Sequence, residues 1–332
     1  MTLRQLRYLI AIADSGLNIT LAAERVHATQ SGISKQLKQL EDELGFPVFL
    51  RKGKSLERIT APGAHIIERA RSILAEAADI RVFAANQRKD AAGQLRIATT
   101  HTQARFALPP AIAAFRRRYP EVDVQILPAS DADVLDRLDG GDADTAIISN
   151  TGATPSNGLA IALYHWQRVI LVPRGHPLAA LAHPPKLTDL ARYPLVSYES
   201  SLRPESTLRH AFSAAGIEPQ IALTARDADL IKTYVRNGLG VGVLAEMAIL
   251  DTDTDLRVLS AEGLFPSCTT WLVLQRDRVV RDYTLDFVAT LAPRFDRRDL
   301  RRLLDSDEAP RADAPSHWRD WAGERLPEAR AA

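Results

Sequence analysis

The sequence has few of the residues on which several classes of protein depend. Its single cysteine, Cys268, excludes a disulfide framework and a cysteine-based metal cluster. No apolar run approaches membrane-spanning length, and the N-terminus lacks the apolar core and cleavage site of a signal peptide. The net charge of +1 excludes a globally basic protein, so any contact with nucleic acid requires a local patch. We therefore expect a cytoplasmic protein that does not contact a membrane.

Catalytic motifs are also missing from the sequence. It contains no G-x-S-x-G, H-E-x-x-H or C-x-x-C stretch, and His101 has no Cys, His or carboxylate companion at motif spacing. The glycine-rich stretch at 238–243 follows a helical pattern and leads into a strand, which is the wrong order for a phosphate loop. Close packing is the better explanation of those glycines. We expect no enzyme, no metal and no cofactor.

The first sixty residues carry the pattern of short helices. In residues 30–44 the apolar side chains recur at helical spacing on one face, after Thr29 as a candidate N-cap and before Gly45 as a stop. The opposite face offers amide, hydroxyl and ammonium groups, which suit base edges and phosphates in a major groove. The candidate DNA-binding residues of this helix are Thr29, Gln30, Ser31, Ser34, Lys35 and Lys38.

Residues 46–60 predict two short strands around a basic turn. Arg51, Lys52 and Lys54 form a wing suited to gripping backbone phosphates beside the helix. Taken alone, Lys35 and Lys38 are explained better by a solvated helix face. The helix pattern, the cap, the polar face and the basic wing together favour a winged helix-turn-helix that binds DNA.

Residues 61–92 predict one long helix and a linker. Six apolar residues alternate at spacings of four and three over about three heptads, and they are Ile66, Ala70, Ile73, Ala77, Ile80 and Ala84. A helix that packs on its own domain would show a similar stripe. The position between two domains favours a helix that dimerises.

From residue 93 the pattern changes to alternating strands and helices, which predicts open α/β sheets. Thr99–Gln103 follows the first strand and leads into a helix expected over residues 104–118. Ligands of such sheets bind beyond the carboxyl ends of the strands, where hydroxyls, an amide and free N–H groups suit a small anion. Alternatively, Thr100 or Thr102 only caps the helix.

Two sets of motifs resemble a known family. AAERVHATQSGISKQLKQLEDELGFPVFLR, followed by ITAPG, resembles the N-terminal domain of LysR-type transcriptional regulators. THTQAR, GDADTAII, YHW and DADLIKTYVRNGLGVGV resemble the CysB subgroup of that family. The resemblance implies an α/β protein overall: a winged helix-turn-helix over 1–60, a linker helix over 61–92, and a periplasmic-binding-protein-like effector domain of two α/β subdomains over 93–296. It also implies promoter DNA as a partner, a homotetramer built as a dimer of dimers, and contact with RNA polymerase.

The resemblance assigns an effector site as well. Ser149 replaces the usual threonine of the subgroup and keeps its hydroxyl, while Tyr164 and Trp166 would line the pocket wall or, equally, belong to the core. The segment after YPLVSY places Ser201 or Arg203 where the subgroup has another hydroxyl. The arginine favours a more strongly anionic ligand if it faces the site rather than solvent. The expected effector-binding residues are Thr99, Thr100, Thr102, Gln103, Ser149, Tyr164, Trp166, Ser201 and Arg203.

The resemblance implies a regulator of sulfur assimilation, either of cysteine biosynthesis or of the use of sulfonates and sulfate esters. Its effector would be a small anion such as sulfate, thiosulfate, acetylserine or adenylyl sulfate. A LysR-type regulator of an unrelated pathway and a cytoplasmic solute-binding protein are the alternatives. Residues 297–332 are rich in proline, alanine and charge, which predicts a mobile tail, with Trp318 and Trp321 able to dock at an unspecified place.

Overall fold

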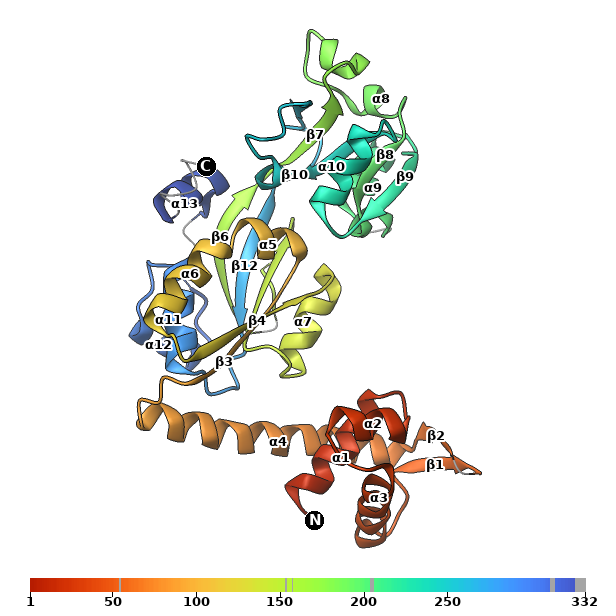
Figure 1. Cartoon of the computed structure of the whole chain (residues 1–332), viewed down its shortest axis with the longest axis vertical. Coiled ribbons are helices and arrows are strands. Elements are labelled where there is room, and N and C mark those ends of the chain that lie inside the picture. Colours follow the sequence, from red (N-terminus) through yellow and green to blue (C-terminus); the bar gives the residue numbers. More distant parts are fainter. Residues whose placement is uncertain (54, 153, 157, 204–205, 311–313, 326–332) are drawn as a thin grey trace. The chain divides into compact units, whose positions relative to one another are not determined.

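The computed structural model describes residues 1–332 except 54, 153, 157, 204–205, 311–313 and 326–332 (Figure 1). The chain divides into two compact units, Met1–Asp90 and Ala91–Ala332. The long helix predicted as a linker belongs to the first unit. The two units are described separately below.

The first unit contains four helices and a two-stranded antiparallel wing within its described residues. Its elements are α1 (Leu3–Asp14), α2 (Ile19–Arg25), α3 (Gln30–Leu44), β1 (Phe49–Lys52), β2 (Ser55–Ile59) and α4 (Ala61–Gln87). The predicted caps of α3 are present: the Thr29 hydroxyl accepts from Gly32 N at 3.1 Å, and Gly45 ends the helix at φ 79°. Ile33, Leu37 and Leu40 are buried in one core with residues of α1 and α2.

Helix α4 begins against the wing and ends with an exposed apolar face. A side chain at Gly63 would meet Val48 O at 2.2 Å, so only glycine allows this close approach to the segment before β1. Ile67 is buried in the core of the first unit, whereas Ile80 and Phe83 are 70% and 57% exposed. The predicted apolar seam is therefore divided between packing within the unit and an open surface.

The second unit contains the two predicted α/β subdomains, each built on one sheet. The strands of the first sheet run in the order β13-β6-β12-β5-β3-β4 and those of the second in the order β11-β7-β10-β8-β9. The strands are β3 (Gly93–Thr99), β4 (Val122–Pro128), β5 (Thr145–Asn150), β6 (Leu159–Trp166), β7 (Arg168–Pro173), β8 (Leu195–Tyr198), β9 (Ile221–Ala225), β10 (Val241–Ala245), β11 (Leu256–Ser260), β12 (Cys268–Leu274) and β13 (Ser316–His317). The chain crosses between the sheets at Gln167, which joins β6 to β7, and again between β11 and β12.

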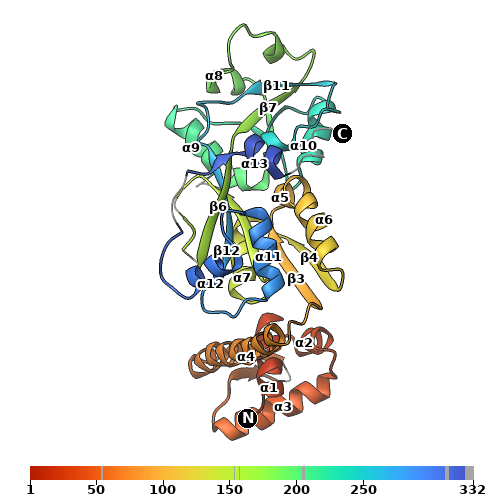
Figure 2. The same cartoon turned by 90° about the vertical axis from the view of Figure 1, so that its left-hand side faces the viewer.

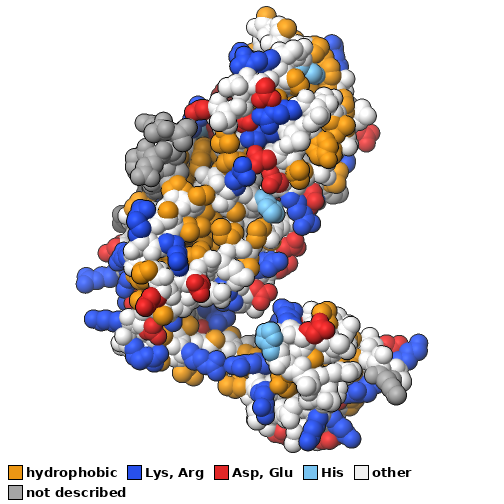
Figure 3. Space-filling view, in the orientation of Figure 1, with side chains coloured by type: hydrophobic (Ala, Val, Ile, Leu, Met, Phe, Trp, Pro, Cys, Tyr) orange, Lys and Arg blue, Asp and Glu red, His pale blue; other side chains and the backbone are white. Residues whose placement is uncertain are grey.

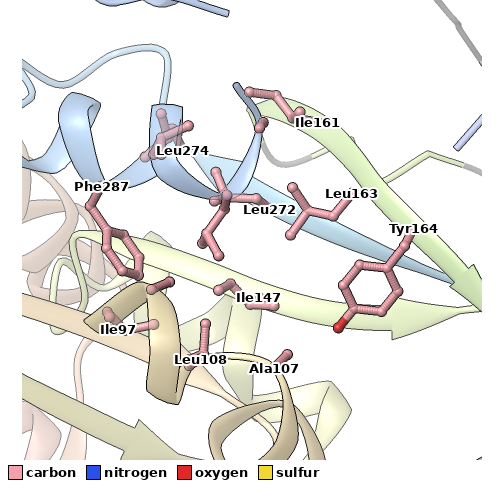
Figure 4. Packing of buried hydrophobic residues seen from close by; sticks show 14 of the residues in the cluster. Ile97, Ala107, Leu108, Ile147, Ile161, Leu163, Tyr164, Leu272, Leu274 and Phe287 are labelled. Carbon is pink, nitrogen blue, oxygen red and sulfur yellow. The ribbon is translucent and has the colours of Figure 1, made fainter. Parts of the chain in front are cut away.

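Helices cover both faces of the first sheet (Figure 2). Ile97, Ile147 and Leu272 pack with α6 (Pro109–Arg118) and α11 (Asp282–Leu291), as Figure 4 shows for part of this core. The alternate strand residues, such as Ala98 and Val273, pack on the other face with α7 (Asp131–Asp139). The remaining helices are α5 (His101–Phe106), α8 (Leu187–Leu190), α9 (Thr207–Ala214), α10 (Ala228–Arg236), α12 (Arg297–Leu304) and α13 (Trp318–Arg325), with short 3-10 turns η1 (Pro177–Ala180), η2 (Glu199–Leu202) and η3 (Glu246–Ala248).

The glycines at 238–243 serve close packing. A side chain at Gly240 would meet Pro194 O at 2.2 Å, and one at Gly242 would meet Val235 Cγ2 at 2.9 Å. Both glycines therefore let β10 lie tightly against its neighbours.

The helix predicted over residues 104–118 is two helices, α5 and α6. Pro109 and Pro110 occupy the first turn of α6, where missing N–H groups cost nothing, but neither could continue an existing helix. The break leaves α5 as a short helix directly after β3.

The tail differs from the mobile segment that the sequence predicts. Leu300, Leu303, Trp318 and Trp321 are buried in the main core of the second unit. Arg297 also holds α12 in place, with Nη2 2.6 Å from an Asp286 carboxylate oxygen. Because the leucines and tryptophans find apolar partners far away in the sequence, the described part of the tail is folded.

Candidate ligand cleft and nucleic-acid interface

A cleft of about 410 Å³ lies in the second unit, between residues carried by its two sheets. Polar residues reach it from the carboxyl ends of β3, β4, β5, β8 and β9, which is where open α/β sheets bind ligands. The predicted residues that line the cleft are Thr100, Thr102, Gln103, Ser149, Trp166 and Arg203.

One wall of the cleft is a hydrogen-bonded cluster of neutral side chains. Gln103 Nε2 donates to Ser149 Oγ at 3.1 Å, and Trp166 Nε1 lies 3.3 Å from the same oxygen. Thr270 Oγ1 joins them, 2.9 Å from Ser149 Oγ. Amide and indole N–H groups can only donate, so they occupy the acceptor positions of the Ser149 oxygen and leave its hydrogen to be donated onward. This wall therefore presents hydrogen-bond donors, which suit an anion.

Thr102 connects the two subdomains across the cleft. Its hydroxyl donates to Tyr198 Oη at 3.3 Å, and Tyr198 also accepts from Ala245 N at 3.3 Å. Burial raises the pKa of Tyr198, although the bond from Thr102 acts in the opposite direction, so the phenol stays neutral at physiological pH. Thr100 precedes α5 as its N-cap residue, but its side chain makes no capping hydrogen bond there. Its hydroxyl is thus available to the cleft, and α5 is not capped in the way that the alternative interpretation requires.

The rest of the cleft carries charge. Arg168 and Arg203 line it, and Arg203 Nη2 lies 3.4 Å from Ser130 Oγ, so this side chain turns toward the cleft. Burial raises the pKa of Asp131, which also lines the cleft, while the positive charges of Arg203 and Arg168 oppose that rise. Arg226 at the cleft is paired with Glu199 at 2.8 Å. Two guanidinium groups, of Arg168 and Arg203, therefore face the cleft together with the Asp131 carboxyl.

Three predicted effector residues lie behind the cleft lining. The Thr99 hydroxyl donates to Ile147 O at 3.0 Å within the sheet, and Ser201 Oγ lies 2.9 Å from Ser197 Oγ in a buried pair. Tyr164 is fully buried and donates its hydroxyl to Gln103 Oε1. Of the two open interpretations of the aromatic pair, Trp166 lines the cleft and Tyr164 belongs to the core, because Tyr164 lies further from the crossover along β6.

Sequence reasoning missed Arg168, Asp131 and Tyr198. Arg168 comes two residues after Trp166, but YHWQRVILVP reads as one continuous strand. The signal was the polar pair at Gln167 and Arg168 inside an apolar run, which marks the crossover from one sheet to the other. Cys268 also lines the cleft, 3.5 Å from Arg168 Nη1, and burial raises the pKa of its thiol despite that arginine.

The polar face predicted on α3 lies on the surface of the first unit. Gln30, Ser31, Lys35 and Lys38 are exposed and Ser34 is half-buried, opposite the buried leucine stripe. Figure 3 shows Lys and Arg side chains around α3 and the wing. A surface of amides, hydroxyls and ammonium groups on a capped helix fits a major groove.

The predicted wing residues differ in their surroundings. Lys52 is exposed at the end of β1, and Arg51 lies 3.6 Å from Glu41, which itself accepts from Val48 N at 2.8 Å. Arg51 therefore also helps to hold the wing on α3. The remaining predicted wing residue, Lys54, lies outside the described residues.

Among the described residues, no group of three or more His, Cys, Asp or Glu side chains is placed to hold a metal ion. No helix there is both long enough and apolar enough to cross a membrane.

Comparison with known families matches both units. The family model described as the LysR substrate binding domain matches residues 88–296. The model described as bacterial regulatory helix-turn-helix protein, lysR family, matches residues 3–64.

Individual relatives extend the match over most of the chain. The HTH-type transcriptional regulator CysB of Haemophilus influenzae is 41% identical over 310 residues, which cover 92% of this chain and 96% of the relative. The regulator Cbl of Klebsiella aerogenes is 38% identical, over 87% of this chain and 91% of the relative. The crystal structure of the cofactor-binding domain of the Cbl transcriptional regulator superposes with a TM-score of 0.59 at 35% identity, over 65% of this chain and 96% of that domain. The chain belongs to the LysR family of transcriptional regulators.

Proposed function

We propose that this chain is an effector-responsive regulator of sulfur assimilation genes, which binds promoter DNA through α3 and the wing and a small anion in the cleft. The donor cluster of Gln103, Ser149 and Trp166 is the observation that carries the anion, since its N–H groups converge on the Ser149 oxygen and leave the hydroxyl hydrogen to be donated to a ligand, without a positive charge in the cluster. Similarity to CysB and Cbl supports the proposal that the regulated genes serve sulfur assimilation, either cysteine biosynthesis or the use of sulfonates and sulfate esters.

Candidate anions are sulfate, thiosulfate, acetylserine and adenylyl sulfate. The donor cluster would hold the compact anionic group. Arg168 and Arg203 would meet additional negative charge further along the cleft, which favours a larger sulfate or phosphosulfate ester. A regulator of an unrelated pathway remains the second candidate, favoured only if the cleft binds none of these anions.

The bound anion would act by changing how the two subdomains close. Thr102 and Tyr198 belong to different subdomains and bond across the cleft, so a ligand beside them would favour one closure state. In a homotetramer that state would alter the spacing of the DNA-binding units and hence contacts with promoter DNA and RNA polymerase. The proposed function places the protein in the cytoplasm, where the promoter DNA is.

A salt-dependent gel shift tests DNA binding directly. The probes are the DNA upstream of the chain's own gene, sulfur-gene promoters and a scrambled duplex. We expect binding to an upstream or sulfur-gene probe that exceeds scrambled DNA and weakens steeply with salt. Equal binding to every probe would rule out a specific regulator and favour a solute-binding protein.

Arginine substitution tests the kind of anion. Arg203→Ala should weaken adenylyl sulfate binding about tenfold or more while changing sulfate binding little, because only the larger ligand reaches this side chain. Arg192→Ala, an exposed arginine outside the cleft lining, is the matched control. Unchanged affinity of Arg203→Ala for every anion would remove this arginine from the site.

A further inference from the structure

The described residues 314–325, called the C-terminal strap below, join the second unit beside the cleft. Strand β13 of the strap pairs in parallel with β6, with Ser316 opposite Tyr164 and His317 opposite His165. The LysR substrate-binding model ends at residue 296, so the strap lies beyond the region that this model matches.

Two tryptophans of the strap pack against the ring of Tyr164. The ring centroids of Trp318 and Trp321 lie 4.9 and 4.6 Å from that of Tyr164, and the two indoles stack at 5.5 Å from each other. Trp321 Nε1 donates to Leu291 O at 3.2 Å, which fixes the indole. Aromatic contacts at these distances attract beyond the effect of burial alone. A docked strap therefore holds the Tyr164 ring in one position.

Tyr164 carries this constraint into the cleft wall. Its hydroxyl oxygen is visible at the edge of the packed core in Figure 4, and the hydroxyl donates to Gln103 Oε1. The amide is thereby oriented with its oxygen toward the core and with Nε2 toward Ser149 at 3.1 Å. A turned amide would present its oxygen to any anion in the cleft, which is unfavourable, and would accept the Ser149 hydrogen that is otherwise donated to the ligand. The hydrogen bond from Tyr164 therefore fixes the Gln103 amide with its N–H group, rather than its oxygen, toward the cleft wall.

A separate set of contacts anchors the strap at the crossover. His317 Nε2 lies 3.0 Å from Glu246 Oε1, and Arg319 Nε lies 3.8 Å from Glu246 Oε2. Glu246 follows β10 of the second sheet, whereas β13 belongs to the first. Glu246 Oε1 also accepts from Gln167 N at 2.7 Å, at the point where β6 becomes β7. The strap thus contacts both subdomains where the chain passes between them.

We propose that the C-terminal strap is a positioning element of the ligand cleft, which acts through Tyr164 on the amide of Gln103. This inference rests on the proposed function, because it takes the ligand of the cleft to be a small anion. Releasing the strap lets Tyr164 move and the Gln103 amide turn. Anion binding then weakens although no side chain that lines the cleft has been changed.

Calorimetric titration of the full chain with sulfate tests the proposal. Trp318→Leu and Trp321→Leu loosen the strap, and Tyr164→Phe removes only the hydroxyl that orients Gln103. Each variant should bind sulfate about tenfold or more weakly, as expected for losing a hydrogen bond to a charged ligand. Trp271→Phe is the control, because Trp271 donates to Asn150 Oδ1 at 3.1 Å and packs on the other face of the sheet.

Thiol labelling gives a readout that needs no ligand. Cys268 is the only cysteine of the chain, lines the cleft and pairs with Trp166 of β6. N-ethylmaleimide should label Cys268 severalfold faster in the strap variants and at the wild-type rate in Trp271→Phe. If a tryptophan variant fails to fold, His317→Ala removes the crossover anchor, leaves the core intact and should give the same acceleration.

The outcomes separate the strap from the proposed function. Folded variants with wild-type sulfate affinity and wild-type labelling overturn the strap proposal. A wild-type chain that binds no sulfate, with strap variants that label faster, overturns sulfate as the ligand while supporting the strap. Weaker sulfate binding together with faster labelling supports both.

Discussion

At the scale of single residues, the sequence predicts which chemical groups line the cleft better than it predicts how deeply each side chain is buried. The hydroxyl and amide run after β3 predicts donors at a strand end, and Thr100, Thr102 and Gln103 do line a cleft. Tyr164 could not be separated from Trp166 in the sequence, because both are aromatic and lie on the same strand. The two differ in their distance from the crossover at Gln167. The position of the crossover is set by the two sheets, whose strands come from distant parts of the chain.

Ser149→Ala tests the donor cluster with a single-atom deletion. The variant keeps the shape of β5 but removes one of the two hydroxyl oxygens, of Ser149 and Thr270, that accept from Gln103 and Trp166, and it removes one donor to the anion. We expect about tenfold weaker sulfate binding, measured by calorimetry. Ser213→Ala on the exposed surface of α9 should bind like the wild type. Equal affinities of the two variants would contradict the assignment of the cleft wall.

At the scale of elements, helices with complete local signals could be predicted and docked segments could not. Helix α3 has its cap, stripe and stop within seventeen residues, from Thr29 to the αL glycine Gly45. The strap has no such local signal. The sequence indicates that Trp318 and Trp321 could dock but not where, because their partner Tyr164 lies about 150 residues away in the chain.

Gln30 and Lys38 of α3 should differ in the kind of DNA contact that they make. Gln30→Ala should cost about 1–3 kcal/mol on the preferred site and relax sequence preference, because it removes a base-edge contact. Lys38→Ala should weaken binding to all duplexes alike and reduce the slope of log affinity against log salt by about 0.9. Fluorescence anisotropy over a salt series measures both effects, with the exposed Gln87→Ala in α4 as control. Identical behaviour of the two α3 variants would argue against a recognition helix.

Helix α12 should make stability depend on pH through Asp286. Burial alone would raise the pKa of this carboxyl, but bonds from Arg297 and Tyr119 lower it below its usual value. A lowered pKa in the folded state stabilises the fold above the unfolded pKa, and this stabilisation is lost as pH falls through the folded value. Asp286→Asn should therefore cost about 1–3 kcal/mol at neutral pH.

Thermal unfolding over a series of pH values checks the direction of the Asp286 pKa shift. The difference in Tm between the wild type and Asp286→Asn should be largest near pH 7 and shrink below about pH 4. Asp307→Asn, at an exposed carboxylate, serves as the control. A difference in Tm that grows on acidification would contradict the lowered pKa.

At the scale of the whole molecule, the order of the two units could be predicted because each carries its own periodicity and motifs. Helix α4 leaves part of its apolar face exposed. Ile80 and Phe83 expose large apolar side chains that a second copy could cover.

Self-association should depend on this face of α4. Ile80→Lys combined with Phe83→Lys should lower the mass observed by sedimentation, because burying two ammonium groups in a helix pair is costly. Arg81→Ala, on the same exposed segment, should keep the wild-type mass. A wild-type mass for the double variant would exclude this face as the contact between copies.

The most direct test of the central claim is a DNA-binding titration with and without the anion. Labelled upstream DNA is titrated with the full chain at constant ionic strength, in sulfate, in thiosulfate and in chloride, for the wild type and Ser149→Ala. We predict that sulfate or thiosulfate changes the DNA affinity or the DNA bend of the wild type and leaves Ser149→Ala unchanged. Sequence-specific DNA binding that responds to no anion, or responds equally in both proteins, would contradict the account.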